Sequence, residues 1–202
     1  EKLKSNIFYE ILNYPKEFPK IKAKLERYCE QELDWLEIWC YHEASSSERK
    51  VKQFNWKLIH DAHYTEKKLH KFGRSDGVCK MCEIEEETVK HMIWDCDYVN
   101  VWWGIISNKI NSVFGIDLNF TNVMQGYHEN LNWNANVALS TVLQYVKWII
   151  WKRRNVKKYH NELKTVETLK RELNFSPKDL VGIIKSRKKI QGESTYLTRF
   201  DL

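Results

Sequence analysis

Residues 79–96 read CKMCEIEEETVKHMIWDC and carry three Cys and one His in the pattern Cys79-x2-Cys82-x8-His91-x4-Cys96. Two Cys separated by two residues can hold one metal ion from a tight turn, and zinc prefers four thiolate or imidazole ligands in a tetrahedron. Four protein ligands leave no position for the water that a catalytic zinc needs. The spacing therefore predicts one structural Zn²⁺.

The interval between His91 and Cys96 constrains the local structure. His91 lies in a predicted helical turn that follows three Glu and Thr88. Five residues of α-helix rotate by about 500°, so these two ligands cannot share one face of an α-helix. We expect Cys96 at or beyond the end of that turn, with the metal joining the end of one helix to the start of the next.

Other interpretations of the His and Cys residues are weaker. Three buried Cys beside an unrelated His would give the same letters, although paired metal-ligand spacings seldom coincide by accident. His60, His63 and His70 suggest a second metal site, but no Cys or carboxylate accompanies them at a matching spacing. We favour structural or surface roles for these three His. The total of five Cys argues against a secreted disulfide framework.

Apolar periodicity outside the motif predicts helices almost everywhere and almost no strand. Thr65 is a candidate N-cap for a short helix that contains Leu69, and Gly115 is a candidate helix end. Residues 116–133 are polar and broken, whereas Thr165 and Ser176-Pro177 are candidate starts of further short helices. The longer predicted helices cover about 19–42, 47–62, 97–114 and 134–160.

The expected fold is mostly α, an irregular helical domain with a small Cys-Cys-His-Cys zinc-stapled unit in the middle. We divide the chain into a helical segment at 1–46, a zinc-binding unit at 47–115, a basic helical region at 116–190 and a tail at 191–202. The chain does not begin with Met, so we expect a longer protein, with 1–46 linking to an upstream region.

The 202 residues carry a net charge of +6 and nine Trp, and they show neither a signal peptide nor a membrane span. A basic chain favours acidic partners, and charge alone does not separate nucleic acid from a membrane surface. On the predicted helix 134–160, one face collects Lys147, Trp151, Arg154 and Lys158, because their spacings are four, three and four. Further candidate phosphate contacts are Lys152, Arg153, Lys157, Lys185, Arg187, Lys188 and Lys189.

The run from Phe54 to Trp103 resembles the zinc-binding C-terminal region of LINE-type non-LTR retrotransposon reverse transcriptases. The resemblance is carried by an aromatic-rich helix, a Thr followed by a Leu, a Cys-x2-Cys pair, Glu-Thr before a His, and a final Cys followed by a Trp. The residues that carry it are Phe54, Trp56, Thr65, Leu69, Cys79, Cys82, Glu87, Thr88, His91, Cys96 and Trp102. The resemblance is specific over about 51–103 and looser on the long predicted helix at about 134–160.

The resemblance implies a non-catalytic module that helps to hold template RNA, target DNA or both during target-primed reverse transcription. The implied partners are nucleic acid and an upstream reverse transcriptase domain of the same polyprotein, without a membrane or a small-molecule substrate. The polyprotein would be an RNA-directed DNA polymerase with endonuclease, located in the nucleus and in cytoplasmic ribonucleoprotein. The alternatives are a structural module that docks on the polymerase, a free-standing RNA binder of the zinc-knuckle kind, and a basic face that serves only solubility.

Overall fold

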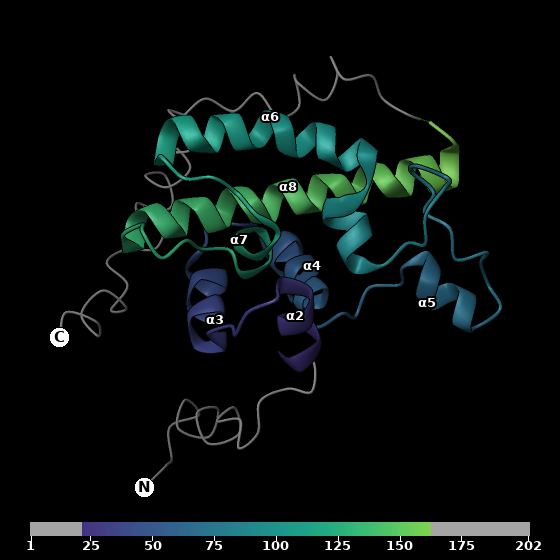
Figure 1. Cartoon of the computed structure of the whole chain (residues 1–202), viewed down its shortest axis with the longest axis horizontal. Helices are drawn as coiled ribbons and strands as arrows, with labels where there is room; N and C mark the ends of the chain where they lie inside the picture. Colours follow the sequence, from purple (N-terminus) through teal and green to yellow (C-terminus); the bar gives the residue numbers. More distant parts are fainter. Residues whose placement is uncertain (1–21, 163–202) are drawn as a thin grey trace, which may run out of the picture.

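The computed structural model describes residues 22–162, and this part of the chain is mostly helical, as predicted (Figure 1). Its one β-type feature is an isolated antiparallel bridge between Val78 and Glu86. The elements are α2 (Lys22–Cys29), α3 (Trp35–Ala44), α4 (Arg49–Ile59), α5 (Glu66–Lys71), the π-helix η1 (His91–Asp95), α6 (Asp97–Phe114), α7 (Phe120–Gln125) and α8 (Trp133–His160).

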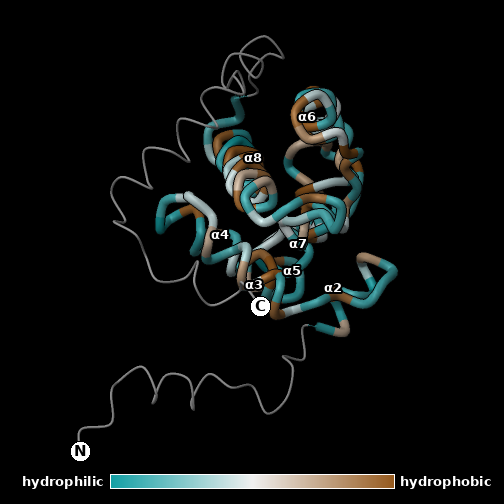
Figure 2. The backbone as a smooth tube through the Cα atoms, turned by 90° about the vertical axis from the view of Figure 1, so that its left-hand side faces the viewer, coloured by the Kyte–Doolittle hydropathy of each residue, from teal (hydrophilic) through white to brown (hydrophobic). Residues whose placement is uncertain are grey.

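The longest helix, α8, forms the centre of the packing. The side chain of Asn132 accepts a hydrogen bond from Ala135 N at its start, and Asn161 ends it in the left-handed conformation. Its buried side chains contact α3 and α4 as well as η1 and α6. Figures 1 and 2 both show α6 lying alongside α8, and the colours of Figure 2 show apolar residues recurring along the two helices. The range predicted for this helix, 134–160, is correct to within one residue.

The helix predicted over residues 19–42 is wrong, because the described part of that range contains two helices. Glu30 has a φ of 56°, a left-handed conformation in which a helix cannot continue. Asp34 then begins α3, since its side chain accepts a hydrogen bond from Glu37 N. A carboxylate at the N-cap satisfies one of the backbone donors that a new helix leaves unpaired.

The remaining predicted boundaries agree well with the structure. The helix predicted over 47–62 is α4, and α5 begins with the Thr65 side chain accepting from Lys68 N. Helix α6 ends at Gly115, whose φ of 67° is easily reached only without a side chain. These caps are local signals, which explains why the sequence revealed them.

Residues 116–133 are more ordered than their polar composition indicated. They contain α7, all six residues of which are buried. The Asn119 side chain accepts from Asn122 N, and the Asn122 side chain accepts in return from Asn119 N. These Asn side chains form a reciprocal cap, which is the physical reason why an Asn-rich segment begins a helix here.

Several sequence predictions lie outside the described residues. They are the short helices expected at Thr165 and Ser176-Pro177, the tail at 191–202, and the cluster Lys185, Arg187, Lys188 and Lys189. The division of the whole chain at residues 46, 115 and 190 likewise stays a prediction. Among the described helices, none is both long and apolar enough to cross a bilayer.

Candidate metal centre

The four predicted ligands come together at the junction of three segments. Cys79 and Cys82 belong to the loop that follows α5, His91 begins η1, and Cys96 lies between η1 and α6. Their candidate ligand atoms all lie within 4.8 Å of one another. Cys79 Sγ is 4.0 Å from Cys96 Sγ, and Cys82 Sγ is 3.4 Å from His91 Nε2.

These distances fit a zinc tetrahedron. With zinc–sulfur bonds of about 2.3 Å and zinc–nitrogen bonds of about 2.0 Å, the edges of a tetrahedron measure about 3.8 Å and 3.5 Å. The Cys79–Cys96 and Cys82–His91 separations differ from those values by at most a few tenths of an ångström, and all four ligand atoms lie within 4.8 Å of one another. Three ligand residues are buried and Cys82 is half-buried, so protein surrounds the site. The donor set and its geometry define one closed, structural Zn²⁺ site.

Backbone hydrogen bonds shape the loop that carries the first two ligands. Met81 N donates to Cys79 Sγ at 3.4 Å, and Glu83 N donates to Cys79 O at 2.8 Å. Glu83 has a φ of 58°, which reverses the chain directly after Cys82. Cys79 N donates to Glu85 O at 2.7 Å beside the Val78–Glu86 bridge. The loop therefore holds both thiols on its inner side.

A π-type turn joins the other two ligands. Cys96 N donates to His91 O at 3.1 Å, a hydrogen bond across five residues rather than four. This wider turn brings ligands five residues apart to the same ion, which an α-helix would not do. The prediction that Cys96 lies at a helix boundary is confirmed, although the π-helix itself was not foreseen.

The thiols of Cys79 and Cys96 alter each other's pKa. The hydrogen bond with Cys96, together with burial, raises the pKa of the Cys79 thiol, and the same contact lowers the pKa of Cys96. The two sulfur atoms thus share a proton where two thiolates would repel each other. Zinc replaces such protons with two positive charges, which explains why zinc binding releases protons and weakens in acid.

A carboxylate lies behind the imidazole ligand. Glu85 Oε2 is 3.0 Å from His91 Nδ1, the ring nitrogen opposite the ligand atom, at ion-pair distance but outside hydrogen-bond geometry. Carboxylates in this position orient the ring and raise its basicity as a ligand. The sequence indicated only an acidic helix start at residues 85–87, because nothing in the spacing distinguishes Glu85 from its neighbours.

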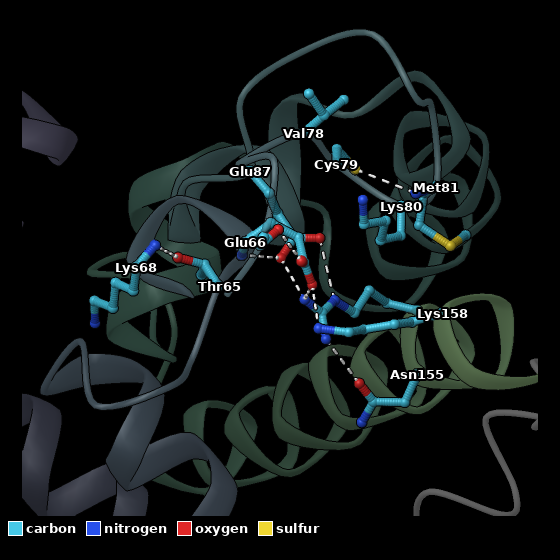
Figure 3. A network of polar contacts seen from close by, with 12 residues as sticks. Thr65, Glu66, Lys68, Val78, Cys79, Lys80, Met81, Glu87, Asn155 and Lys158 are labelled. Carbon is cyan, nitrogen blue, oxygen red and sulfur yellow. Dashed lines mark hydrogen bonds and ion pairs between the residues drawn. The ribbon is translucent and has the colours of Figure 1, made fainter. Parts of the chain in front are cut away.

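Glu87, from the same acidic run, has a separate role in the interior. Arg154 Nη2 lies 2.7 Å from Glu87 Oε1, and Arg154 also pairs with Glu66. Burial alone would raise the pKa of Glu66, but Lys158, Ser75 and Arg154 together lower it. Glu66, Glu87 and Arg154 are at most 3% exposed. Figure 3 shows the two carboxylates turned toward Lys158 on α8. This cluster fastens the zinc loop and α5 to α8.

Two of the predicted phosphate contacts are buried, so their assignment to a nucleic-acid surface is wrong. Arg154 is 3% exposed within the ion cluster, and Lys147 is 1% exposed. Lys147 Nζ donates to Val123 O at 2.8 Å, near the C-terminal end of α7, where helix carbonyls lack partners. Burial lowers the pKa of Lys147 to about 7. Both side chains serve packing between helices.

The other predicted phosphate contacts on α8 differ in their exposure to solvent and in their ion pairs. Lys152 is exposed and Arg153 is half-buried. Lys157 Nζ lies 3.1 Å from Glu83, and Lys158 Nζ lies 2.5 Å from Glu66. Trp151 stacks on Trp148 and also contacts Phe54 and His63. The positive charge on this helix is therefore partly neutralised by the zinc-binding half of the structure.

The three isolated His residues each bond to a backbone carbonyl. His60 Nδ1 is 3.0 Å from Trp56 O, His63 Nε2 is 3.0 Å from Phe54 O, and His70 Nδ1 is 2.9 Å from Ser75 O. Burial is the main reason why the pKa of His63 is lowered. These contacts are the structural roles that the sequence favoured.

Residues 23–103 match a protein family described as zinc-binding in reverse transcriptase. The matched segment is about two fifths of the chain and contains all four zinc ligands. Comparison with curated proteins and with solved structures gave no match. The segment is thus similar to a zinc-binding domain associated with reverse transcriptases, and not to a catalytic domain.

Proposed function

We propose that the chain is a nucleic-acid-binding, zinc-stabilised module of a LINE-type non-LTR retrotransposon reverse transcriptase. It would lie C-terminal to the polymerase domain of the same polyprotein and help to hold template RNA, target DNA or both during target-primed reverse transcription. Its place of action would be the nucleus and the cytoplasmic ribonucleoprotein. The observation that carries the proposal is the family match over the segment that contains the closed zinc site.

The zinc would act by positioning rather than by chemistry. It ties the loop after α5 to the start of α6, and the ion cluster of Glu66, Glu87 and Arg154 ties that loop to α8. Because these contacts hold α8 in place, Lys152, Arg153 and Lys157 would keep a constant arrangement on its surface. Cations held in one arrangement neutralise phosphates and release their counterions, which supplies most sequence-independent affinity.

A filter-binding titration of the full chain with RNA and with duplex DNA tests this proposal. Replacing Lys152, Arg153 and Lys157 together by Ala removes three cations, and the control replaces Arg27, Lys71 and Lys109, on three other helices. If each of the first three contacts a phosphate, the slope of log K against log salt falls by roughly 2 to 3, because each contact contributes about 0.7 to 0.9. Equal slopes for the two variants would contradict the assignment.

The alternative is a structural module that docks on the polymerase domain without affinity for nucleic acid. One observation favours it: Arg154, Lys157 and Lys158 all have acidic partners inside the fold, which reduces the free positive charge on α8. In that case the wild-type chain would bind neither RNA nor DNA in the titration, and it would still bind the polymerase domain. The same experiment therefore separates the two functions.

A further inference from the structure

Helix α4 turns a second basic and aromatic face toward solvent, away from the contacts that α4 makes with α8. Its members are Arg49, Gln53, Trp56 and Lys57, with His60 directly after the helix. At about 100° per residue these five positions fall within an arc of about 100°, so they form one stripe. The opposite side of α4 buries Val51, Phe54 and Leu58.

Aromatic rings in this stripe are already stacked. Trp56 is 45% exposed, and its ring lies on the His60 ring at a centroid distance of 4.2 Å and an interplanar angle of 24°. On its other side, His60 packs against Trp39 and Trp35 of α3, at centroid distances of 5.3 Å and 6.3 Å. The hydrogen bond from His60 Nδ1 to Trp56 O fixes the His60 ring. Trp56 is thus the outermost ring of a ladder that continues inward through His60 to Trp39.

The cations on either side of Trp56 are free of acidic partners. Arg49 and Lys57 are exposed, and within residues 22–162 neither forms an ion pair with a carboxylate. Their neighbours on the same helix differ, because Lys50 pairs with Glu48 and Lys52 lies 3.9 Å from Glu43. The stripe therefore offers two unneutralised positive charges flanking an exposed, ordered ring.

We propose that this stripe is a stacking platform for single-stranded nucleic acid, an inference that rests on the proposed function and adds a site to it. A base would stack on the open face of Trp56, while Arg49 and Lys57 would contact phosphates on either side. Single strands expose their base faces to such rings, whereas a duplex hides them. Because the ladder fixes the ring beforehand, little side-chain entropy is lost when a base binds.

The test uses the full chain and labelled oligo(U) and oligo(dT) of about 20 nucleotides, longer than a typical single-strand site. A mixed-sequence duplex of the same length is the second probe. Trp56→Leu keeps an apolar side chain but removes the aromatic face, and Trp133→Leu is the matched control. Trp133 is 40% exposed and packs on Tyr41, far along the chain from α4. Zinc content and thermal unfolding establish that each variant is folded.

The platform predicts that Trp56→Leu weakens single-strand binding by about 5- to 150-fold, since base stacking on an aromatic residue contributes about 1–3 kcal/mol. The salt slope of single-strand binding should be unchanged in Trp56→Leu. The affinity of Trp56→Leu for the duplex, and that of the control Trp133→Leu for single strands, should stay within about twofold of wild type, a difference of less than 0.5 kcal/mol. Replacing Arg49 and Lys57 together by Ala should instead lower the single-strand salt slope by about 1.4.

The possible failures are distinguishable. If wild type binds oligonucleotides and folded Trp56→Leu binds them equally well, the platform is wrong and the proposed function stands. If wild type binds no oligonucleotide and no duplex, both ideas fail together, and the exposed Trp56 is then assigned to a contact with protein.

Discussion

Arg154 and Glu87 form a buried, two-point ion pair across 67 residues of sequence. Arg154 Nη2 is 2.7 Å from Glu87 Oε1, and Arg154 Nε is 3.1 Å from Glu87 Oε2. Glu87 precedes the zinc ligand His91 by four residues, so the contact links the metal loop to the C-terminal third of α8. Glu66 shares the same guanidinium, so two carboxylates face one Arg side chain.

Replacing Arg154 by Met should strongly destabilise the zinc-loaded protein. The change leaves Glu66 and Glu87 buried without their main partner, and breaking a buried pair from one side costs about 3–5 kcal/mol. Urea unfolding measures the effect. The neighbouring exposed change Lys152→Met is the control and should stay within about 0.5 kcal/mol. A loss for Arg154→Met no larger than for the control would show that the cluster contributes little.

A double substitution adds a sharper test of the same pair. Glu87→Gln removes the negative charge that Arg154 faces, so the effects of the two single changes should not add. We expect a coupling energy in the range of about 0.5–3 kcal/mol between contacting residues. Additive effects would mean that the two side chains stabilise the fold independently.

Loss of a zinc ligand should release the metal and unfold the surrounding region. Cys96→Ser removes a thiolate that is also the residue before α6, so both zinc content and helicity should fall. Cys40→Ser is the control, because Cys40 lies outside the four-residue cluster. Metal analysis and circular dichroism measure the outcome, and one zinc per chain retained by Cys96→Ser would refute the site.

The carboxylate behind His91 gives a milder prediction. Glu85→Ala should weaken zinc binding by about 10- to 100-fold, as removal of such outer partners generally does, while the ligands stay intact. Glu86→Ala is the control, because Glu86 is exposed but pairs with Lys67 instead. Competition with a chromophoric chelator measures both affinities. Equal affinities would show that Glu85 does not orient the ring.

The buried Lys147 predicts an unusual dependence of stability on pH. Its pKa is lowered to about 7 in the folded chain, so between that pH and its usual value the unfolded state binds the extra proton. The free energy of unfolding should therefore rise with pH in this window, by up to about 1.4 kcal/mol per unit from this group. Below about pH 7 the contribution levels off, because both states then hold the proton.

Lys147→Met should remove that dependence. Unfolding in urea at several pH values between about 7.5 and 9.5 compares the two proteins, and their difference isolates the amine because all other groups are shared. The variant should show the flatter profile. Parallel profiles would indicate that Lys147 stays protonated in the folded protein.

What the sequence revealed was local. The zinc ligands, the Thr65 cap and the end of α6 at Gly115 each depend on residues a few positions apart, and all three are correct. The break at Glu30 and the start of α7 at Asn119 also had local signals, namely an N-cap Asp and paired Asn. Apolar periodicity outweighed the first signal, and polar composition concealed the second.

What the sequence concealed depends on distant partners. Lys147 and Arg154 follow the spacing of a basic surface, and nothing near them shows that this side of α8 faces the interior. The carboxylates that balance Arg154 come from α5 and from the zinc loop, 88 and 67 residues away. Conversely, the sequence indicated for Trp56 only a family resemblance, and the fold shows that its ring stacks on His60.

Cys96 connects the zinc site directly to the start of α6. The residue is at once the last ligand and the N-cap of α6, an 18-residue helix. At 1.5 Å per residue that helix is about 27 Å long, so a rotation of about 5° at the ligand swings its far end by about 2 Å. A metal-dependent shift of Cys96 would therefore reach the far end of α6, where the packing of α6 against α8 opposes it.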